Sequence, residues 1–350
     1  MSRLRASRFG AQGHPRASKI LIVKLGSLGD IIHAIPAAAA IRRAFPHSEI
    51  DWLADARHRE LVDLVPILGR RILIDTSAMS SIARTVGELR ARRYDVTLDL
   101  QGLLKSAVLA RLSGASRVIG FPSDLLRERA ARAFYTEMAG DAQPHVIDKN
   151  MSMLKAIGIR TPDLEFPLDQ GNPRAAADAR SRLGVPDGTR FAIINPGAAW
   201  PNKRWPPVYF AEVARALSAR YDLRSLVLWG PGEEQLAHDI VAASDGTAAV
   251  SARTSVADLL ALARASALMI SGDTGPMHIA GAVGTPLVGI FGPTDPQRNG
   301  PWGEDDLTVS RYRSCDCHYQ RRCHISGWCL LDIAPREVMD LVERRLATHA

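Results

Sequence analysis

The stretch from residue 268 to residue 296 combines small residues that expose the backbone with polar side chains that could contact a ligand. Its pattern predicts, in order, a strand ending at residue 270, a turn at 271–276, the opening of a helix at 277–283 and a second strand at 287–291. Thr274 and Gly275 leave the backbone N–H groups uncovered, and Pro276 suits the first helical turn. Together with the helix dipole, these amides would bind an anion, and a diphosphate is the natural ligand.

Two further side chains of this stretch could contact a phosphorylated sugar. Asp273 could accept hydrogen bonds from sugar hydroxyls, and His278 could donate to a phosphate. Residues 292–296 form another polar turn after the next strand, at the edge of the sheet where ligands of α/β proteins bind. The alternative is an ordinary strand–turn–helix unit without a ligand, which is common in α/β proteins.

A second glycine-rich loop, at residues 24–30, follows a buried strand predicted at 20–23. The loop contains Ser27 and Gly29 but lacks the third glycine of a dinucleotide fingerprint, so a nicotinamide cofactor is disfavoured. Asp30 comes at the start of a helix, where an exposed carboxylate could act as a general base. The alternative is that Asp30 is a helix N-cap, and the sequence leaves both open.

The second half of the chain has further polar positions after predicted strands. Lys203 lies in a loop at the carboxyl end of a strand, where it could face a phosphate; a surface salt bridge is the alternative. Trp229 ends a strand predicted at 226–229, and Gly230 opens the loop that follows it. Glu234, in the same loop, could accept both hydroxyls of a ribose or cap the next helix.

Basic residues are frequent in the first half. Arg57 and Arg59 follow a strand predicted at 50–54, and Lys105 opens a helix after a strand predicted at 94–100 that leads to Gln101. Most of the arginines are expected on solvated helix faces. A few of them near Asp30 would suffice to bind an acidic acceptor.

Composition indicates an ordinary soluble globular protein. The chain has 350 residues, 46% of them hydrophobic and 23% charged, and no apolar run is long enough to cross a membrane. Its net charge of +7 favours acidic partners. Basic segments interleaved with aromatic residues are lacking, so a nucleic-acid partner is not expected.

The order of predicted elements indicates two α/β domains of the Rossmann-like, doubly wound type, with parallel sheets, facing each other across a cleft. A Pro-, Gly- and acid-rich linker at 161–173 separates a first domain at 19–165 from a second at 174–334. A last segment, 335–350, contains an amphipathic helix that is expected to pack across the domains. Residues 1–18, with four arginines and no acid, are expected to be a disordered basic arm of a cytoplasmic protein, which either contacts a membrane surface or has no role.

All four cysteines fall near the end of the chain in the pattern C-x-C-x5-C-x5-C, as Cys315, Cys317, Cys323 and Cys329. Four soft ligands within so short a segment fit a tetrahedral structural site for zinc or iron. Reduced cysteines without a ligand are the next interpretation, and disulfides are disfavoured in the cytoplasm.

Three of these segments, residues 24–33, 99–106 and 271–278, together resemble the heptosyltransferases of lipopolysaccharide inner-core synthesis, which form glycosyltransferase family 9 and have the GT-B fold. The resemblance extends over roughly residues 19–346. The Ser-Leu-Gly-Asp sequence and the Gln-Gly-x-x-Lys-Ser segment look more like the members that act first, on the Kdo sugar of lipid A, than like those that act second. The cysteine-rich tail is similar to tails of other members.

The resemblance implies an inverting transfer of heptose from ADP-L-glycero-D-manno-heptose to a Kdo–lipid A type acceptor at the cytoplasmic face of the inner membrane, with no cofactor needed for catalysis. Asp30 would be the general base, and Lys203 would stabilise the leaving diphosphate. The implied donor-binding residues are Trp229, Gly230, Glu234, Asp273, Thr274, Gly275, Pro276 and His278. The expected acceptor-binding residues are Ser27, Gly29, Arg57, Arg59, Gln101 and Lys105. The alternative is another nucleotide-sugar enzyme with the same fold, either an epimerase or a transferase with another sugar or acceptor.

Overall fold

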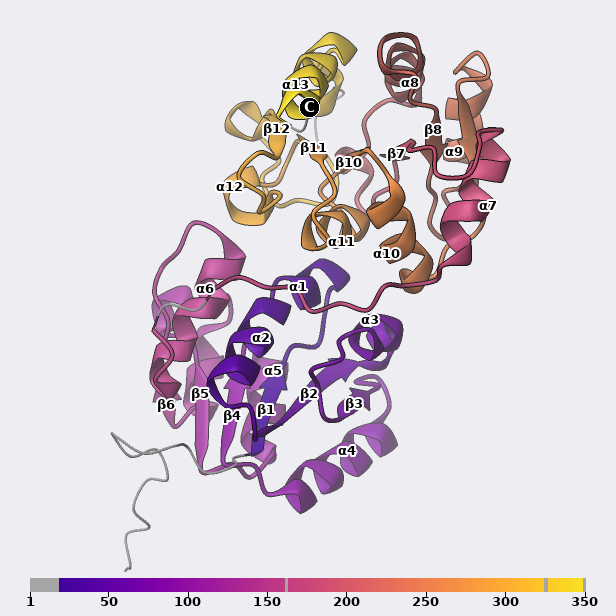
Figure 1. Ribbon diagram of the computed structural model, residues 1–350. Helices are drawn as coiled ribbons and strands as arrows, with labels where there is room; N and C mark the ends of the chain where they lie inside the picture. Colours follow the sequence, from indigo (N-terminus) through magenta and orange to yellow (C-terminus); the bar gives the residue numbers. More distant parts are fainter. Residues whose placement is uncertain (1–18, 161–162, 324–326, 349–350) are drawn as a thin grey trace, which may run out of the picture. The chain divides into compact units, whose positions relative to one another are not determined.

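The computed structural model describes residues 19–160, 163–323 and 327–348 (Figure 1). The chain divides into two compact units between Asp169 and Gln170. This boundary falls inside the segment 161–173 that was expected to be the linker. The basic arm expected at residues 1–18 lies outside the described residues.

The first unit contains a six-stranded sheet in the order β3-β2-β1-β4-β5-β6, with parallel pairing throughout. Its strands are β1 (Lys19–Val23), β2 (Glu49–Asp55), β3 (Arg71–Ile74), β4 (Val96–Asp99), β5 (Arg117–Gly120) and β6 (Glu137–Met138). Its α-helices are α1 (Leu28–Ile32), α2 (Ile35–Ala44), α3 (Arg59–Asp63), α4 (Met79–Arg92), α5 (Leu104–Leu112) and α6 (Val146–Ser152). Its short 3-10 helices are η1 (Ala56–His58), η2 (Ser123–Leu125), η3 (Arg129–Phe134) and η4 (Met153–Ile157).

The second unit repeats this plan with the sheet order β12-β11-β10-β7-β8-β9, again parallel. Its strands are β7 (Ala192–Asn195), β8 (Ser225–Val227), β9 (Ala248–Val250), β10 (Leu268–Gly272), β11 (Leu287–Phe291) and β12 (Leu307–Ser310). Its α-helices are α7 (Arg174–Leu183), α8 (Pro207–Tyr221), α9 (Glu234–Ala242), α10 (Val256–Ala265), α11 (Gly275–Ala282), α12 (Pro296–Asn299) and α13 (Pro335–Ala347). The 3-10 helices are η5 (Pro201–Lys203), η6 (Tyr312–Ser314) and η7 (Cys329–Asp332).

In the second sheet, successive side chains of a strand point to opposite faces, and apolar residues are buried on both faces. Ile194 and Ile270 pack in one cluster with Trp205 and residues of α8 and α13, whereas Ile193 and Met269 pack in another with residues of α7, α10 and α11. Side chains one residue apart in a strand point to opposite faces, so one apolar run supplies both clusters. The two-sided burial explains why these strands read as continuous apolar segments.

Strand order determines where a ligand can bind in each unit. Both sheets have the doubly wound 3-2-1-4-5-6 order, which reverses between β1 and β4 in the first unit and between β7 and β10 in the second. Ligands of such sheets bind beyond the carboxyl ends of the strands at the reversal. The loops after these four strands contain most of the predicted site residues. The predicted fold class of two Rossmann-like parallel-sheet domains is confirmed.

The final helix was expected to pack across the domains. Within its own unit α13 contacts α8, β11 and β12 (Figure 1), and its packing across the domains stays a prediction. Its buried residues Val338, Met339 and Val342 join the same cluster as Trp205. None of the described helices is both long and apolar enough to cross a membrane.

Candidate active site

The second unit brings two strand ends together where its strand order reverses. β7 ends at Asn195, which pairs with Ser271 of β10. The buried Asn195 amide donates hydrogen bonds of 2.8 Å to the hydroxyl of Ser271 and of 2.8 Å to that of Thr274. These bonds fix the turn that leads into α11. The motifs predicted from the sequence assign no role to Asn195, although a polar residue that ends an apolar strand is a signal that could have identified it.

Lys203, Asp273 and His278 form one largely buried cluster. The Lys203 Nζ donates to Oδ2 of Asp273 at 2.6 Å and lies 4.5 Å from the centroid of the Trp200 ring. The His278 Nε2 lies 3.4 Å from Oδ1 of Asp273. No side chain of the three is more than 14% exposed. The structure therefore joins three residues that the sequence placed at separate positions of the sheet edge.

Asp273 has both of its carboxylate oxygens engaged. Burial would raise its pKa, but the hydrogen bonds and charges of His278 and Lys203 outweigh burial and hold the pKa of this carboxyl well below its usual range. Asp273 is therefore ionised at neutral pH and positions Lys203. Its expected contact with sugar hydroxyls stays a prediction, because a carboxylate has more lone pairs than these two partners use.

The start of α11 lies directly beside this cluster in the chain. Thr274 is the N-cap with an extended backbone, and Gly275 and Pro276 form the first turn. Because proline has no N–H, the first-turn amides that can donate are those of Gly275 and Met277. Amides at a helix N-terminus next to a lysine suit an anionic ligand. In the turn after β11, Asp295 instead caps α12 by accepting from Gln297 N at 2.9 Å.

In the loop after β8, Glu233 makes hydrogen bonds within the site, whereas the predicted residue was its neighbour Glu234. Glu233 accepts hydrogen bonds of 3.1 Å from Gly230 N and of 3.1 Å from Arg204 Nη2. A Cβ atom at Gly197 would lie 1.9 Å from a Glu233 oxygen, so glycine is required there for this approach. Glu234, the predicted ribose ligand, lies in the first turn of α9 with 60% of its side chain exposed. Glu234 thus remains a prediction, and Glu233 is a second candidate for the same role.

The loop after β1 holds Asp30 at the start of α1. Asp30 occupies the third helical position and Ser27 is the N-cap, so the alternative that Asp30 is the N-cap is wrong. Asp30 Oδ2 accepts from Ser27 N at 2.8 Å and from Ser27 Oγ at 3.0 Å. Its Oδ1 is 3.7 Å from Nζ of the buried Lys24, and 38% of the Asp30 side chain is exposed. Gly29, inside α1, is buried.

The loop after β4 supports the loop after β1. Gln101 Oε1 accepts from Leu25 N at 3.1 Å and from Gly26 N at 3.3 Å. The fully buried Asp99 holds Gln101 in place by accepting from its backbone N at 3.0 Å, and from Ser106 Oγ at 2.9 Å. Burial raises the pKa of Asp99. The residues that carry the family resemblance in these two segments are thus one connected network, in which Gln101 positions the Asp30 loop.

The predicted basic acceptor residues have different surroundings. Arg57 is 81% exposed and pairs with Asp55 at 2.9 Å, and this pair lowers the pKa of Asp55. Arg59 is exposed at the start of α3, and Lys105 is exposed and hydrogen-bonded to Thr76. These side chains are accessible to an anionic partner, and their acceptor role stays a prediction.

The four cysteines also come together in the second unit. Cys315, Cys317, Cys323 and Cys329 all line a cavity of about 80 Å³. Cys315 and Cys317 are buried, and the other two are partly buried. Among the described residues, no group of three or more His, Cys, Asp or Glu side chains already has the arrangement of a metal site.

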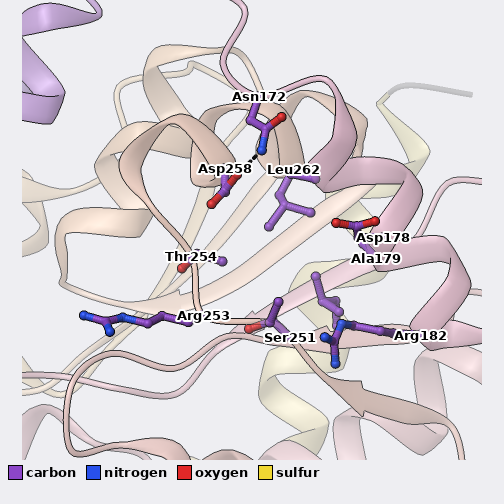
Figure 2. Close-up of a pocket in the computed structure, with 12 residues that line it drawn as sticks. Asn172, Asp178, Ala179, Arg182, Ser251, Arg253, Thr254, Asp258 and Leu262 are labelled. Carbon is purple, nitrogen blue, oxygen red and sulfur yellow. Dashed lines mark hydrogen bonds between the residues drawn. The ribbon is translucent and has the colours of Figure 1, made fainter.

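A separate cavity of about 140 Å³ lies between α7, α10 and the end of β9 (Figure 2). Asn172 donates to Asp258 at its edge at 2.7 Å, and Arg182 and Arg253 also line it. The lining includes none of the three residues of the Lys203 cluster. One lining residue, Ser251, nevertheless contacts a predicted donor-binding residue, because its carbonyl accepts a hydrogen bond from Trp229 Nε1 at 2.9 Å.

Comparison with known proteins gives a consistent result. The family model for glycosyltransferase family 9 (heptosyltransferase) matches residues 82–329. Lipopolysaccharide heptosyltransferase 1 of Pseudomonas aeruginosa is 28% identical over 317 residues, which cover 87% of each chain.

Solved structures have the same fold. A family 9 glycosyltransferase from Veillonella parvula superposes with a TM-score of 0.80 at 22% identity, covering 95% of this chain and 97% of the other. The Escherichia coli heptosyltransferase WaaC with ADP superposes with a TM-score of 0.74 at 22% identity, covering 94% of this chain and 99% of the other.

Proposed function

The chain belongs to glycosyltransferase family 9, the heptosyltransferases, and from this we propose that it transfers heptose from a nucleotide-linked donor to a sugar of the lipopolysaccharide core. The donor is ADP-L-glycero-D-manno-heptose and the acceptor is the Kdo sugar attached to lipid A. The relative in Pseudomonas aeruginosa bears the name of a heptosyltransferase 1, and the Escherichia coli structures contain ADP or ADP-2-deoxy-2-fluoro heptose. A lipid-linked acceptor brings the reaction to the cytoplasmic surface of the inner membrane.

The observation that carries the donor assignment is the cluster of Lys203, Asp273 and His278 beside the first turn of α11. The departing diphosphate gains negative charge as the glycosidic bond breaks. Lys203 and the amides of Gly275 and Met277 stabilise that charge, which is commonly the largest contribution to catalysis of this kind. Asp273 holds Lys203 in position through the 2.6 Å contact. Charge stabilisation by these groups needs no metal ion.

Asp30 is the general base in this proposal. The acceptor hydroxyl oxygen attacks the anomeric carbon from the side opposite the diphosphate, so the configuration inverts. The carbon–oxygen bond to the diphosphate breaks, ADP departs, and the hydroxyl proton passes to the Asp30 carboxylate. The hydrogen bonds from Ser27 fix the orientation of the carboxylate and leave lone pairs for the incoming proton. Arg57, Arg59 and Lys105 bind the anionic groups of the acceptor.

The test is incubation of the purified protein with ADP-L-glycero-D-manno-heptose and Kdo–lipid A, followed by mass spectrometry of the lipid product and chromatography of the nucleotide. We expect one heptose added to the acceptor and one ADP released. Epimerised or free heptose with unmodified acceptor would contradict transfer and support another nucleotide-sugar activity. GDP- and UDP-linked sugars in parallel reactions test the base of the donor, and only the ADP-linked sugar should react efficiently.

A further inference from the structure

All the cysteines of this chain line a single small cavity. Cys315 and Cys317 follow η6, Cys323 lies in the next turn and Cys329 begins η7. The backbone N–H of Cys317 donates to Cys315 Sγ at 3.4 Å. Four sulfur atoms from residues 315–329 therefore share a space of about 80 Å³.

An all-sulfur donor set has a restricted ligand chemistry. Four thiolates in a compact segment bind zinc or iron in tetrahedral sites, whereas calcium and magnesium prefer oxygen. The described side chains are not already arranged as a metal site. Cysteine ligands lose their protons when they bind a metal ion, so metal binding and proton release occur together.

The cysteine segment also holds the loop that carries Lys203. The amide of Asn202 is buried; its Nδ2 donates to Gln320 O at 3.0 Å and lies 3.9 Å from Cys323 Sγ. On the other side of Lys203, Trp328 Nε1 donates to the carbonyl of Arg204 at 3.1 Å. Both neighbours of Lys203 in the chain are thus fixed by the segment that contains the cysteines.

The same segment packs against the turn after β11. Tyr319 N donates to Pro293 O at 2.9 Å, and a Cβ atom at Gly292 would lie 3.1 Å from Cys329 Sγ. The cysteine segment thus packs against two loops, the one that carries Lys203 and the turn after β11. A loss of structure in this segment would remove contacts from both loops.

We propose that Cys315, Cys317, Cys323 and Cys329 bind one zinc or iron ion, and that this ion keeps the segment folded against the loop that carries Lys203. The ion has a structural role and takes no part in sugar transfer. Removal of the ion leaves the pair between Lys203 and Asp273 in place but loosens the backbone on both sides of Lys203. Donor binding should then weaken without being lost.

The first test measures metal in the full-length protein purified under reducing conditions from cells grown with added zinc or added iron. We expect about one equivalent of metal per chain by elemental mass spectrometry, and the two cultures distinguish zinc from iron. The double variant Cys317→Ser/Cys329→Ser removes two of the four thiols that line the cavity and should lose the metal. Asp316→Asn, which changes a side chain of the same cavity without removing sulfur, should retain it.

The second test uses intact protein and so does not depend on how the variants fold. Cobalt(II) added to reduced, metal-free protein should give the absorption bands of a tetrahedral thiolate complex, and zinc should displace it. Stripping the metal should speed amide hydrogen exchange in residues 200–205 and weaken ADP binding about tenfold, the size expected for one or two lost hydrogen bonds.

Three results would overturn the proposal. They are metal-free protein from both cultures with no cobalt uptake, retention of metal by the double cysteine variant, and a mass deficit showing that the thiols form disulfides in the cell. Metal content and hydrogen exchange are measured without any sugar transfer, so failure here is distinguishable from failure of the proposed activity.

Discussion

The two oxygens of Asp30 have different surroundings. Oδ2 accepts both hydrogen bonds from Ser27, and Oδ1 faces Lys24 at a distance too long for a hydrogen bond. A base needs an oriented carboxylate with an accessible oxygen, and the 38% exposure of the side chain provides access. One carboxylate can thus hold the N-cap residue Ser27 through Oδ2 and accept a proton.

Replacing Asp30 tests this role. Asp30→Asn keeps the shape and an oxygen acceptor but cannot take up a proton, so turnover should fall by at least about a hundredfold. Affinity for ADP, measured by calorimetry, should change little, because the donor residues belong to the second unit. Asp63→Asn, at an exposed acid at the end of α3, should leave both quantities unchanged. Normal turnover in Asp30→Asn would remove Asp30 from the mechanism.

Asp273 makes stability depend on pH in a defined direction. Its pKa in the folded protein is below the usual value, so the unfolded chain binds a proton more readily. The stabilisation is therefore complete above the unfolded pKa of about 3.9 and is lost as the pH falls below it. Asp273→Asn removes the contribution and leaves Lys203 without its charged partner, at a cost of roughly 3 kcal/mol at neutral pH.

The measurement is urea unfolding of the second unit, for the unmodified chain and for Asp273→Asn. The pH is varied from about 3, below the usual pKa of an aspartate, to about 7. The difference in free energy of unfolding should be constant above about pH 5 and shrink below about pH 4. A difference that does not vary with pH would mean that Asp273 does not titrate with the folding equilibrium.

Which residues could be predicted depends on how local their determinants are. Lys203, Asp273 and His278 follow strand ends, and the rule that parallel strands end at one edge predicts that they lie at the same edge but not that they are in contact. Glu233 and Glu234 are adjacent acids that look equivalent in the sequence. The choice between them depends on the space left by Gly197, which lies after a different strand and has no local signature.

At the scale of elements, the glycine in the loop after β7 decides how the loops after β7 and β8 meet. Glu233 approaches Gly197 so closely that a methyl group there would overlap its carboxylate. The same carboxylate accepts from Gly230 N and Arg204, so its displacement breaks two hydrogen bonds at once. The contact joins the loop that carries Lys203 to the loop that begins α9.

Gly197→Ala should therefore destabilise the second unit by roughly 1–3 kcal/mol and weaken ADP binding. Gly87→Ala is the matched control, because Gly87 lies inside α4 with nothing within 4 Å of its added Cβ. Alanine favours a helix over glycine by about 1 kcal/mol, so this control should be slightly stabilising. Thermal unfolding compares the two variants, and equal effects would show that the Glu233 contact does not constrain position 197.

The ends of helices and strands could be predicted where the local sequence pattern is strong. The strand β11 begins and ends at the residues that the sequence predicts. The strand predicted at 226–229 is β8 at Ser225–Val227, so Trp229 lies beyond it in the loop. β9 and β12 are short strands next to polar residues and have no pattern that predicts them. Their place in the sheet depends on pairing with β8 and β11, which is a long-range interaction.

At the scale of the whole molecule, the chain is two repeats of one design with separate cores. Clusters around Leu21 in the first unit and around Ile193 and Ile194 in the second are each built from residues of one unit. Units with their own cores need not unfold in one step. The base is assigned to the first unit and the donor residues to the second, so ligand binding and catalysis can be examined separately.

ADP should therefore stabilise only the second unit. At about 100 times its dissociation constant, a ligand adds roughly 2.7 kcal/mol to the state that binds it, which raises the midpoint of a domain of this size by roughly 5–10 °C. In scanning calorimetry, one transition should shift and the other should stay in place. Hydrogen exchange should slow at residues 195–205, 230–234 and 271–278 and stay unchanged at 24–30. Lys203→Ala should abolish most of the shift, and UDP should produce less of it than ADP. Protection of residues 24–30 by ADP alone would contradict the assignment of the donor to the second unit, because the nucleotide would then contact the loop that holds the base.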